Sequence, residues 1–495
     1  MFFLGSCDSS QAVFSAPSIL SRRLQLMVFS SPIFVFSFLL FSLASYYFSP
    51  VRFRHLGLTI LSYVFYGWWN PWFMILMFAS TVVDYCCGVV IAHKGRPKLG
   101  LLLSVISNLA VLSFFKYFNF AFQSASSLAT AFGFEMPETP LWMSHIVLPM
   151  GISFYVFQSM SYCIDLYRGH APPAKSFVDF ACFVSLYPQL VAGPIVRYGS
   201  IAHQLQHRDH HVEAFVMGIS RFCLGFAKKI LLADAMGQLA DMAFKSGPGS
   251  LSMLAAWLGV IAYAFQIYFD FSAYSDMAIG LGRMFGFRFI ENFNSPYKSA
   301  SITEFWRRWH ISLSTFLRDY LYIPLGGNRK GVRRTYVNLM TVMLLGGLWH
   351  GAQWTFVIWG GIHGTMLAFE RMVGKNAISQ KLPRLLKVFL TFIILLLTWV
   401  YFRAENFTVA TQYLAAMTGW GSVNPTASLI DAMMLSRGAL IYFVFAGLVI
   451  WALPNSQQML QRLTAWKALA CLALFVCALA VMFQQGYSPF LYFQF

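Results

Sequence analysis

Two histidines stand in surroundings that give an imidazole a chemical use. His310 lies in the segment from Glu291 to Arg334, the least hydrophobic part of the chain, and His350 lies in an apolar run from Leu339 to Phe369. An imidazole with a pKa of about 6.5 can accept a proton at neutral pH. A neutral histidine in a dry pocket can therefore deprotonate a hydroxyl group as that group attacks a thioester carbonyl. His350 and His310 are the candidate catalytic residues.

A purely structural role is the alternative for His350, and it is the favoured role for a third histidine, His363. His350 is flanked by glycines at 346, 347 and 351, which allow close backbone approach and leave room for a substrate beside the ring. The same imidazole could instead bond a carbonyl group of a neighbouring helix, and the residues alone leave both interpretations open. His363 lies in the glycine-rich stretch 360–364, which favours a packing role for that histidine.

The surroundings of His310 are unusually polar for a chain of this composition. If the stretch is one helix, Trp306 and Ser314 flank His310 one turn away on either side, and Arg307 shares its face. A charged side chain facing lipid at mid-bilayer costs at least ~2.5–3.5 kcal/mol, and this segment carries several. We therefore expect the segment to be recessed in a protein-lined cavity, in an interface, or in both.

The elements that position these residues are predicted to be membrane helices. Of 495 residues, 58% are hydrophobic and 11% are charged, well below the roughly 25% charged that soluble domains carry. Runs without a charged residue recur at 27–47, 99–115, 250–269, 388–402, 438–453 and 468–483. In lipid the backbone must satisfy its own hydrogen bonds. We predict an all-α polytopic membrane protein of about eleven transmembrane helices, with additional re-entrant or interfacial helices.

The excess of basic residues fits the same interpretation. The formal net charge is +17, and Lys and Arg gather in short loops such as 94–98, 329–334 and 371–387. Positive loops between apolar spans are typical of the cytoplasmic side of a membrane protein, where they contact anionic lipids. No basic soluble domain stands apart, which argues against nucleic acid as a partner.

Neither a metal site nor a nucleotide-binding loop is indicated. His203 and His207 would share a helix face, but no acidic or cysteine partner has a suitable spacing, so a solvated loop or surface helix is favoured. The eight cysteines form no framework and suit small core positions. Gly280, Gly282 and Gly286 miss the dinucleotide spacing by one residue, which favours close helix packing.

No repeat or linker divides the chain, so residues 27–495 are predicted to form a single membrane domain. Residues 1–26 contain Leu4-Gly5-Ser6-Cys7, which superficially resembles a lipoprotein cleavage box. The segment lacks a basic n-region, and its apolar stretch is shorter than a signal peptide needs. We expect residues 1–26 to be a disordered leader or a misassigned start, with Met27 opening the protein.

Motifs spread from residue 27 to the end resemble the membrane-bound O-acyltransferase family, in particular its alginate O-acetyltransferase branch. The family signature is an Asn or His in a polar segment followed by a buried His, as His310 and His350 are placed. The other motifs that carry the resemblance are 27–31, 63–69, 114–117, 148–155, 192–194, 268–276, 291–328, 345–350 and 488–495. Residues 1–26 match nothing in the family.

The resemblance implies a ring of helices around a tunnel through a thinned membrane, with His350 as the catalytic histidine and His310 as the second family histidine. It implies acetyl-CoA from the cytoplasm as the acetyl donor. The basic residues available to bind the CoA phosphates are Arg307, Arg308, Arg318 and Lys330. The alternative for these residues is ion pairing, for instance between Arg308 and Glu304 one turn apart.

The branch further implies a relay across the bacterial inner membrane. Acetyl crosses the membrane, and a periplasmic partner of the SGNH-hydrolase kind completes its transfer to the sugar hydroxyls of an exopolysaccharide, alginate or cellulose, beside the machinery that makes and exports the polymer. D-alanine transfer to teichoic acid and acylation of lipids are the nearest alternatives. A transporter could use His350, Asp270 and Asp276 as a proton path, but the expected pair of related halves with broken helices is not visible.

Overall fold

The computed structural model describes residues 27–485 apart from 94, 135–139, 141, 144–145, 192, 209, 248, 375–380 and 421–422. Throughout this described part, the regular elements are helices. The expected leader at 1–26, Ala192 of the motif 192–194 and the motif at 488–495 lie outside the described residues. The prediction of an all-α protein is confirmed.

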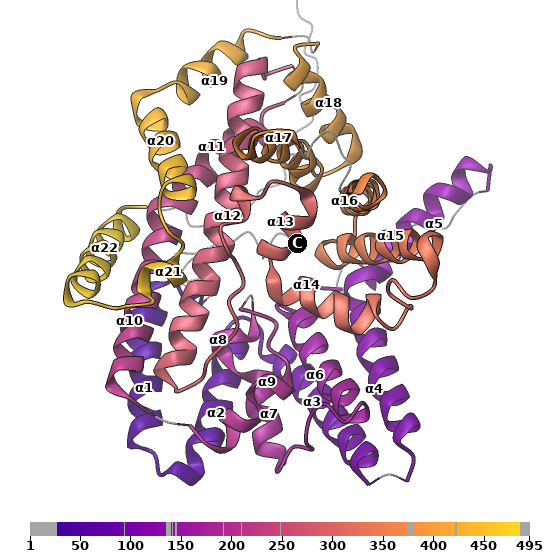
Figure 1. The fold of residues 1–495 in the computed structure, drawn as a ribbon, viewed down its shortest axis with the longest axis vertical. Helices are drawn as coiled ribbons and strands as arrows, with labels where there is room; N and C mark the ends of the chain where they lie inside the picture. Colours follow the sequence, from indigo (N-terminus) through magenta and orange to yellow (C-terminus); the bar gives the residue numbers. More distant parts are fainter. Residues whose placement is uncertain are drawn as a thin grey trace, which may run out of the picture.

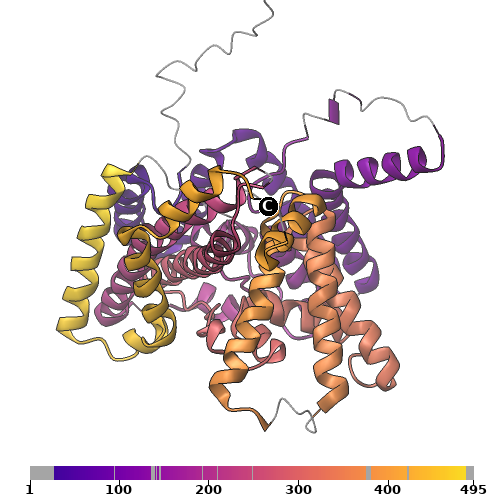
Figure 2. The ribbon, with the colours of Figure 1, turned by 90° about the horizontal axis from the view of Figure 1, so that it is seen from above.

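The helices of the first half of the chain form one group, which apart from α5 lies in the lower part of Figure 1. Helices α3, α4 and α6 pack on one another, and α2 packs against α3 and α7. Helix α5 continues α4 and projects from the body (Figure 2). The group comprises α1 (Leu39–Phe48), α2 (Arg54–Gly67), α3 (Pro71–Ala92), α4 (Pro97–Leu112), α5 (Phe118–Ala131), α6 (Ile152–Tyr167), α7 (Phe177–Ser185), α8 (Tyr187–Leu190) and α9 (Tyr198–Gln206).

The second half is built around α12, a helix of 32 residues that is buried along most of its length. Helices α10, α11, α17 and α18 pack directly on it, and α22 packs on α10. The helices of this half are α10 (Val212–Ala227), α11 (Asp234–Phe244), α12 (Met253–Met284), α13 (Ile302–Arg308), α14 (Ile311–Leu317), α15 (Gly331–His350), α16 (Trp354–Val373), α17 (Arg384–Arg403), α18 (Phe407–Thr418), α19 (Thr426–Met434), α20 (Arg437–Trp451), α21 (Ser456–Leu460) and α22 (Ala465–Gln484).

Glycines set the closest approach between the paired helices. A Cβ atom on Gly280 of α12 would lie 2.6 Å from the carbonyl oxygen of Gly218 on α10. Between α15 and α16, a Cβ on Gly347 or on Gly360 would clash with the backbone of the facing helix. These positions therefore accept only glycine, as small residues at membrane helix interfaces do. The expectation that the glycines near 280 serve helix packing is confirmed for Gly280.

Within the described residues, four segments of π-helix interrupt the helices: η2 (Phe34–Phe38), η4 (Ser113–Tyr117), η6 (Lys228–Ala233) and η8 (Arg318–Tyr322). A π-turn inserts an extra residue into the helix and is frequent at functional sites. Three of the four carry basic side chains, namely Lys116, the pair Lys228 and Lys229, and Arg318. The contacts of Lys116, Lys228 and Arg318 are described below.

In the described part of the chain, five helices are long and apolar enough to cross a membrane, or six if the bent pair α19 and α20 forms one span. The five are 71–92, 97–131, 253–284, 384–403 and 465–484. The prediction of about eleven spans is not confirmed at this count. Helices α2 and α6 have 14 and 16 residues, shorter than the roughly 20 that a perpendicular span requires.

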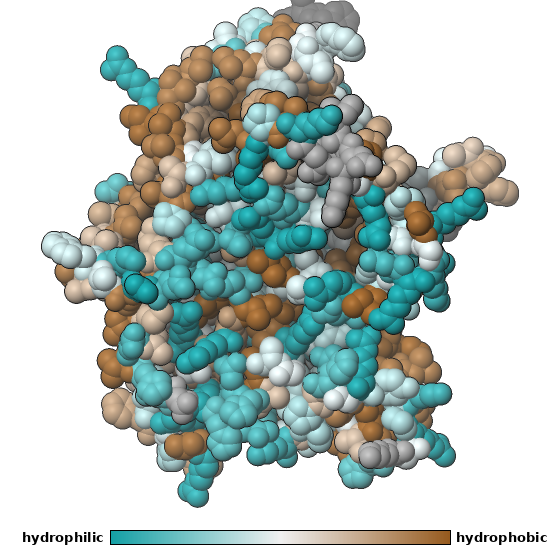
Figure 3. All heavy atoms as spheres, in the orientation of Figure 1, coloured by the Kyte–Doolittle hydropathy of each residue, from teal (hydrophilic) through white to brown (hydrophobic). Residues whose placement is uncertain are grey.

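Two large apolar cores lie side by side and meet near the middle of the molecule. The first core contains Leu313, Phe316 and Trp349 with the helices of the first half. The second contains Trp309 and Phe402 with α11, α12 and α17. On the face viewed in Figure 3, polar side chains cover the middle, while apolar ones gather along the upper left rim over α19 and α20. The segment between α13 and α15 lies at the boundary of the two cores.

Candidate active site

His310 occupies a break between two short helices. Its backbone is left-handed, with φ of 43°, and it forms the N-cap of α14. A non-glycine residue in this region is uncommon and is maintained by its surroundings. Two backbone hydrogen bonds hold the break: Ile311 N–H donates to the carbonyl of Asn292 at 2.9 Å, and Asn294 N–H donates to that of Arg308 at 2.9 Å.

This break corrects one prediction. Trp306 lies on α13 and Ser314 on α14, so His310 does not share a continuous helix face with them or with Arg307. The sequence pattern suggested one helix because no glycine or proline marks the break. The expectation that the segment is recessed is confirmed for His310, whose exposed fraction is 0%.

The His310 imidazole is held by polar neighbours on one edge and by aromatic rings. Its Nδ1 lies 3.2 Å from Oδ1 of Asn292. The ring of Phe271 on α12 meets it edge-on at a centroid distance of 4.6 Å, and that of Trp349 lies 5.9 Å away. Among the described residues, the other ring nitrogen, Nε2, has no hydrogen-bond partner although it is buried.

His350 is the last residue of α15, and its side chain turns into the same region. Its ring centroid lies 6.4 Å from that of His310, with the ring planes inclined by 61°. Trp359 of α16 and Phe402 of α17 meet the His350 ring at 5.4 and 5.1 Å. Helix α15 ends here because Gly351 takes an extended backbone. The structure thus brings the two candidate histidines together inside the protein.

The C-terminal end of α15 is held by the π-segment η4. The Lys116 ammonium donates to the carbonyl of Trp349 at 2.5 Å and lies 3.3 Å from that of His350, while the Tyr117 hydroxyl donates to Leu348 at 2.9 Å. The last carbonyls of a helix lack partners within it and carry its negative dipole end, so a cation there is stabilising. No carboxylate in the described part of the chain pairs with Lys116.

An apolar pocket of about 170 Å³ opens beside His350. Arg318 and Tyr322 of η8 stand among its lining residues, and Gly346 contributes the part nearest to α14. The rest of the lining is Trp306, Leu313, Ser314, Leu317, Leu339, Val342, Met343 and Leu367. The pocket therefore extends between the His350 imidazole and the Arg318 guanidinium along a mainly apolar path.

From the sequence, the glycines around His350 were expected both to allow close backbone approach and to leave room for a substrate. In the structure these two roles belong to different glycines. Gly346 alone faces the pocket, where an added Cβ would lie 3.3 Å from Leu317. Gly347 packs against the α16 backbone, and Gly351 packs against the ring of Phe356. Only one of the three therefore leaves room beside the histidine.

The four basic residues proposed for donor binding differ in their contacts. Arg318, with a side chain 60% exposed, pairs with Asp319 at 2.6 Å and also lines the His350 pocket. Arg308 pairs with Glu304 at 2.8 Å, the alternative foreseen for it. Arg307 and Lys330 are exposed and form no ion pair within the described residues. Of the four, only Arg318 reaches the pocket.

His363 makes the contacts of a structural residue. The indole N–H of Trp306 donates to its Nδ1 at 3.3 Å, so that nitrogen is the acceptor. Its Nε2 then donates to the Thr398 hydroxyl at 3.2 Å, and that hydroxyl donates to the carbonyl of Leu395 at 2.9 Å. Both nitrogens are satisfied, which fixes a neutral ring in this chain of hydrogen bonds.

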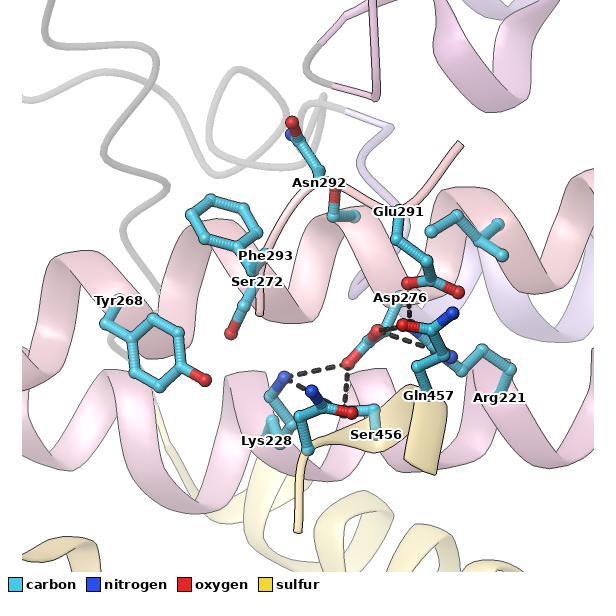
Figure 4. Close-up of a pocket in the computed structure, with 13 residues that line it drawn as sticks. Arg221, Lys228, Tyr268, Ser272, Asp276, Glu291, Asn292, Phe293, Ser456 and Gln457 are labelled. Atoms are coloured by element: carbon cyan, nitrogen blue, oxygen red, sulfur yellow. Dashed lines mark hydrogen bonds and ion pairs between the residues drawn. The ribbon is translucent and has the colours of Figure 1, made fainter. Parts of the chain in front are cut away.

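A buried network of ion pairs lies next to the site, and Figure 4 shows it. Asp276 on α12 bonds Arg221 of α10 at 2.6 Å, Lys228 of η6 at 2.7 Å and the Ser456 hydroxyl of α21 at 2.6 Å. Arg221 also bonds Glu291 at 2.6 Å. Such charges are tolerated in a membrane protein when they pair with each other.

Sequence reasoning did not assign roles to Lys116, Arg221 or Asn292. A signal existed for Lys116, because it and Lys98 are the only charged residues in the helical stretch 97–131, and an isolated charge in an apolar helix needs a partner. Asn292 appeared only as one polar residue among several. Its pairing with His310 depends on a turn of the chain that has no marker in the sequence.

The chain is similar to known proteins along nearly its whole length. The model of the MBOAT, membrane-bound O-acyltransferase family, matches residues 170–404, a range that contains both histidines. A probable alginate O-acetylase of Azotobacter vinelandii is 46% identical over 95% of this chain and 100% of its own length. One from Pseudomonas putida is 44% identical over 95% and 100%. A peptidoglycan O-acetyltransferase of Helicobacter pylori is 35% identical over 96% and 98%. The chain therefore belongs to the membrane-bound O-acyltransferase family and is an O-acyltransferase.

Proposed function

We propose that this inner-membrane enzyme takes acetyl from cytoplasmic acetyl-CoA and passes it across the membrane for O-acetylation of an exopolysaccharide, alginate or cellulose. The observation that carries the proposal is the position of His350, at the end of an apolar pocket and beside a second buried histidine. An imidazole in that place lines a route by which a ligand hydroxyl can reach it and give up its proton.

The proposed chemistry uses His350 as general base. Its imidazole removes the proton of an acceptor hydroxyl while the oxygen attacks the thioester carbonyl of acetyl-CoA. The tetrahedral intermediate then collapses, the C–S bond breaks, and the imidazolium returns the proton to the departing thiolate. His310 orients the acceptor. The sequence of steps consumes no proton and requires no metal.

The donor is proposed to enter along the basic side of the pocket. Arg318 is supported by its place in the pocket lining, and a guanidinium suits bidentate contact with phosphate. Arg307 and Lys330 are exposed and can add longer-range attraction. Arg308 has the weakest support as a residue that binds the donor, because its guanidinium is already paired with the Glu304 carboxylate.

The acetyl group is proposed to reach the polymer through a periplasmic partner of the SGNH-hydrolase kind, within the assembly that makes and exports the polysaccharide and among the lipids of the membrane. The alginate O-acetylase relatives favour alginate as the acceptor. Peptidoglycan is a second candidate, because the Helicobacter relative is named for it and matches almost the whole chain. Transfer of D-alanine to teichoic acid, or of an acyl group to a lipid, would require the same pocket to bind a different substrate. A proton-coupled transporter is disfavoured, because Asp270 and Asp276 are both ion-paired.

The test is a complementation experiment with two acceptors. The chain is expressed in an alginate-producing bacterium that lacks its own membrane O-acetylase, and the acetyl content of alginate and of peptidoglycan is measured. We expect acetyl on alginate and none added to peptidoglycan. Acetyl on peptidoglycan alone would establish the second candidate. Acetyl on neither polymer, with normal membrane levels of the chain and its partner present, would contradict alginate as the acceptor.

A further inference from the structure

We propose that Asn292 is a positioning residue that sets the tautomer of His310, placing the ring proton on Nδ1 and leaving Nε2 as the nitrogen that accepts a hydrogen bond. The importance of this tautomer for turnover rests on the function proposed above. The tautomer itself does not, because it follows from hydrogen-bond geometry.

The orientation of the Asn292 side-chain amide is determined by a backbone donor. Oδ1 of Asn292 lies 3.1 Å from the backbone nitrogen of Ser312, which can only donate. The Ser312 hydroxyl also donates to this oxygen, at 2.9 Å. The oxygen and not the amide nitrogen therefore faces the His310 side of the break.

The His310 tautomer follows from that orientation. Its Nδ1 lies 3.2 Å from the same Oδ1 and 3.4 Å from the Ser312 hydroxyl oxygen. An amide oxygen accepts and cannot donate, and the hydroxyl hydrogen is already directed at Asn292. Only a proton on Nδ1 makes both contacts favourable. In a neutral imidazole the lone pair then resides on Nε2.

Nε2 of His310 is available for a ligand. It is buried and without a hydrogen-bond partner among the described residues, an arrangement that costs free energy in a dry interior. The His350 ring lies close by, at 6.4 Å between centroids. A second donor group of the ligand would bond to Nε2, while the hydroxyl that is acetylated directs its single hydrogen at His350.

The direction of the Asn292 side chain is fixed by Glu291, its neighbour in the sequence. The segment 289–294 is non-helical, and in an extended stretch adjacent side chains point to opposite sides. Figure 4 shows the Glu291 carboxylate turned toward Arg221 and Asp276, while the Asn292 amide points away from these ion pairs. The bond from Arg221 to Glu291, at 2.6 Å, thus anchors the segment that presents Asn292 to His310.

The tautomer can be measured without turnover, by solid-state NMR of the full chain in lipid bilayers with ¹⁵N- and ¹³C-labelled histidine. The chain has 11 histidines, and the His310 signal is identified by its loss in His310→Ala. We expect Nδ1–H in the wild type and in Asn292→Asp, which keeps an acceptor oxygen. We expect loss of that preference in Asn292→Leu. An Nε2–H tautomer in the wild type, or an unchanged His310 signal in Asn292→Leu, would overturn the inference.

Activity separates this inference from the proposed function. Acetyl transfer per unit of extracted protein is expected to fall about 10²-fold in Asn292→Leu, to be largely retained in Asn292→Asp, and to fall no further when Asn292→Leu is added to His310→Ala. Asn294→Leu is the matched control, since Asn294 Oδ1 accepts from Asn455 at the surface. If the wild type shows the predicted tautomer but His310→Ala keeps full activity, the tautomer is established and the role of His310 in turnover is contradicted.

Discussion

The imidazole rings of His310 and His350 face each other at 6.4 Å between centroids, although one residue begins a helix and the other ends one. Each backbone leaves helical geometry at or just after its histidine, and this turns both side chains into the space between α14 and α15. The His350 ring lines the apolar pocket, and the His310 ring is its buried neighbour. The pairing therefore depends on where two helices terminate, and the predictions below test the contacts that set those ends.

Replacing Arg318 with glutamine is expected to weaken CoA binding several-fold and to reduce its dependence on salt concentration, because one phosphate contact is lost. Arg318 lines the His350 pocket, whereas the exposed Arg329 does not. Arg329→Gln is therefore the matched control and should leave binding nearly unchanged. Isothermal titration at two ionic strengths provides the measurement. Equal behaviour of the two variants would assign Arg318 to its ion pair with Asp319 alone.

Filling the pocket at Gly346 should block acetyl transfer. The leucine side chain of Gly346→Leu would occupy space in the cavity of about 170 Å³ beside His350. We expect the rate at which CoA is released from acetyl-CoA to fall at least about 10-fold. The amount of the variant in the membrane should stay near that of the wild type. Gly361→Leu on α16 is the control, because an added Cβ there makes only ordinary contact, 3.6 Å from Leu344. Full activity of Gly346→Leu would show that substrate does not use this pocket.

Lys116 is expected to matter through the end of α15. Lys116→Met removes the cation that bonds Trp349 and lies beside the carbonyl of His350, so the last turn should loosen and the imidazole should shift. A displacement of about 1 Å can cost on the order of 10²-fold in rate. Acetyl transfer per unit of protein is the readout, with Lys98→Met on the exposed start of the same helical stretch as control. Equal activities of Lys116→Met and Lys98→Met would show that Lys116 does not position His350.

Asp276→Asn should destabilise the whole fold. The carboxylate bonds Arg221 and Lys228 in a buried setting, and removing one partner of a buried ion pair costs about 3–5 kcal/mol. The unfolding temperature of the detergent-extracted protein should fall by several degrees. Lys245→Gln breaks the exposed pair with Asp241 and should change stability by at most about 1 kcal/mol. A stable Asp276→Asn protein without activity would instead place Asp276 in the reaction.

Much of the architecture could be predicted from the sequence, because apolar runs and isolated polar residues report directly on burial in lipid. The all-helical membrane fold and the recessed position of His310 follow from the cost of charge in a bilayer. The number of spans could not be predicted in this way. Several apolar runs form helices too short for a perpendicular span, and the run 250–269 is only part of a helix that continues to Met284.

The details of the site depended on tertiary contacts without a local signal. The break at His310 is held by backbone bonds from the segment around Asn292, and the end of α15 is held by Lys116 from a helix more than 200 positions earlier. The ion pair of Arg308 with Glu304 was foreseen because it obeys a spacing rule within one helix. Interactions between distant segments obey no such rule.

The most direct test of the central claim is His350→Ala, with protein abundance and polymer acetylation measured in the same cells. The His350 ring makes no hydrogen bond within the described residues, so its removal should leave membrane abundance nearly normal. Acetylation should fall about 10²–10⁴-fold, the usual contribution of a positioned general base. His363→Ala is the control and should lower abundance first, because Trp306 and Thr398 lose their partner. Normal abundance with normal acetylation in His350→Ala would contradict the catalytic assignment.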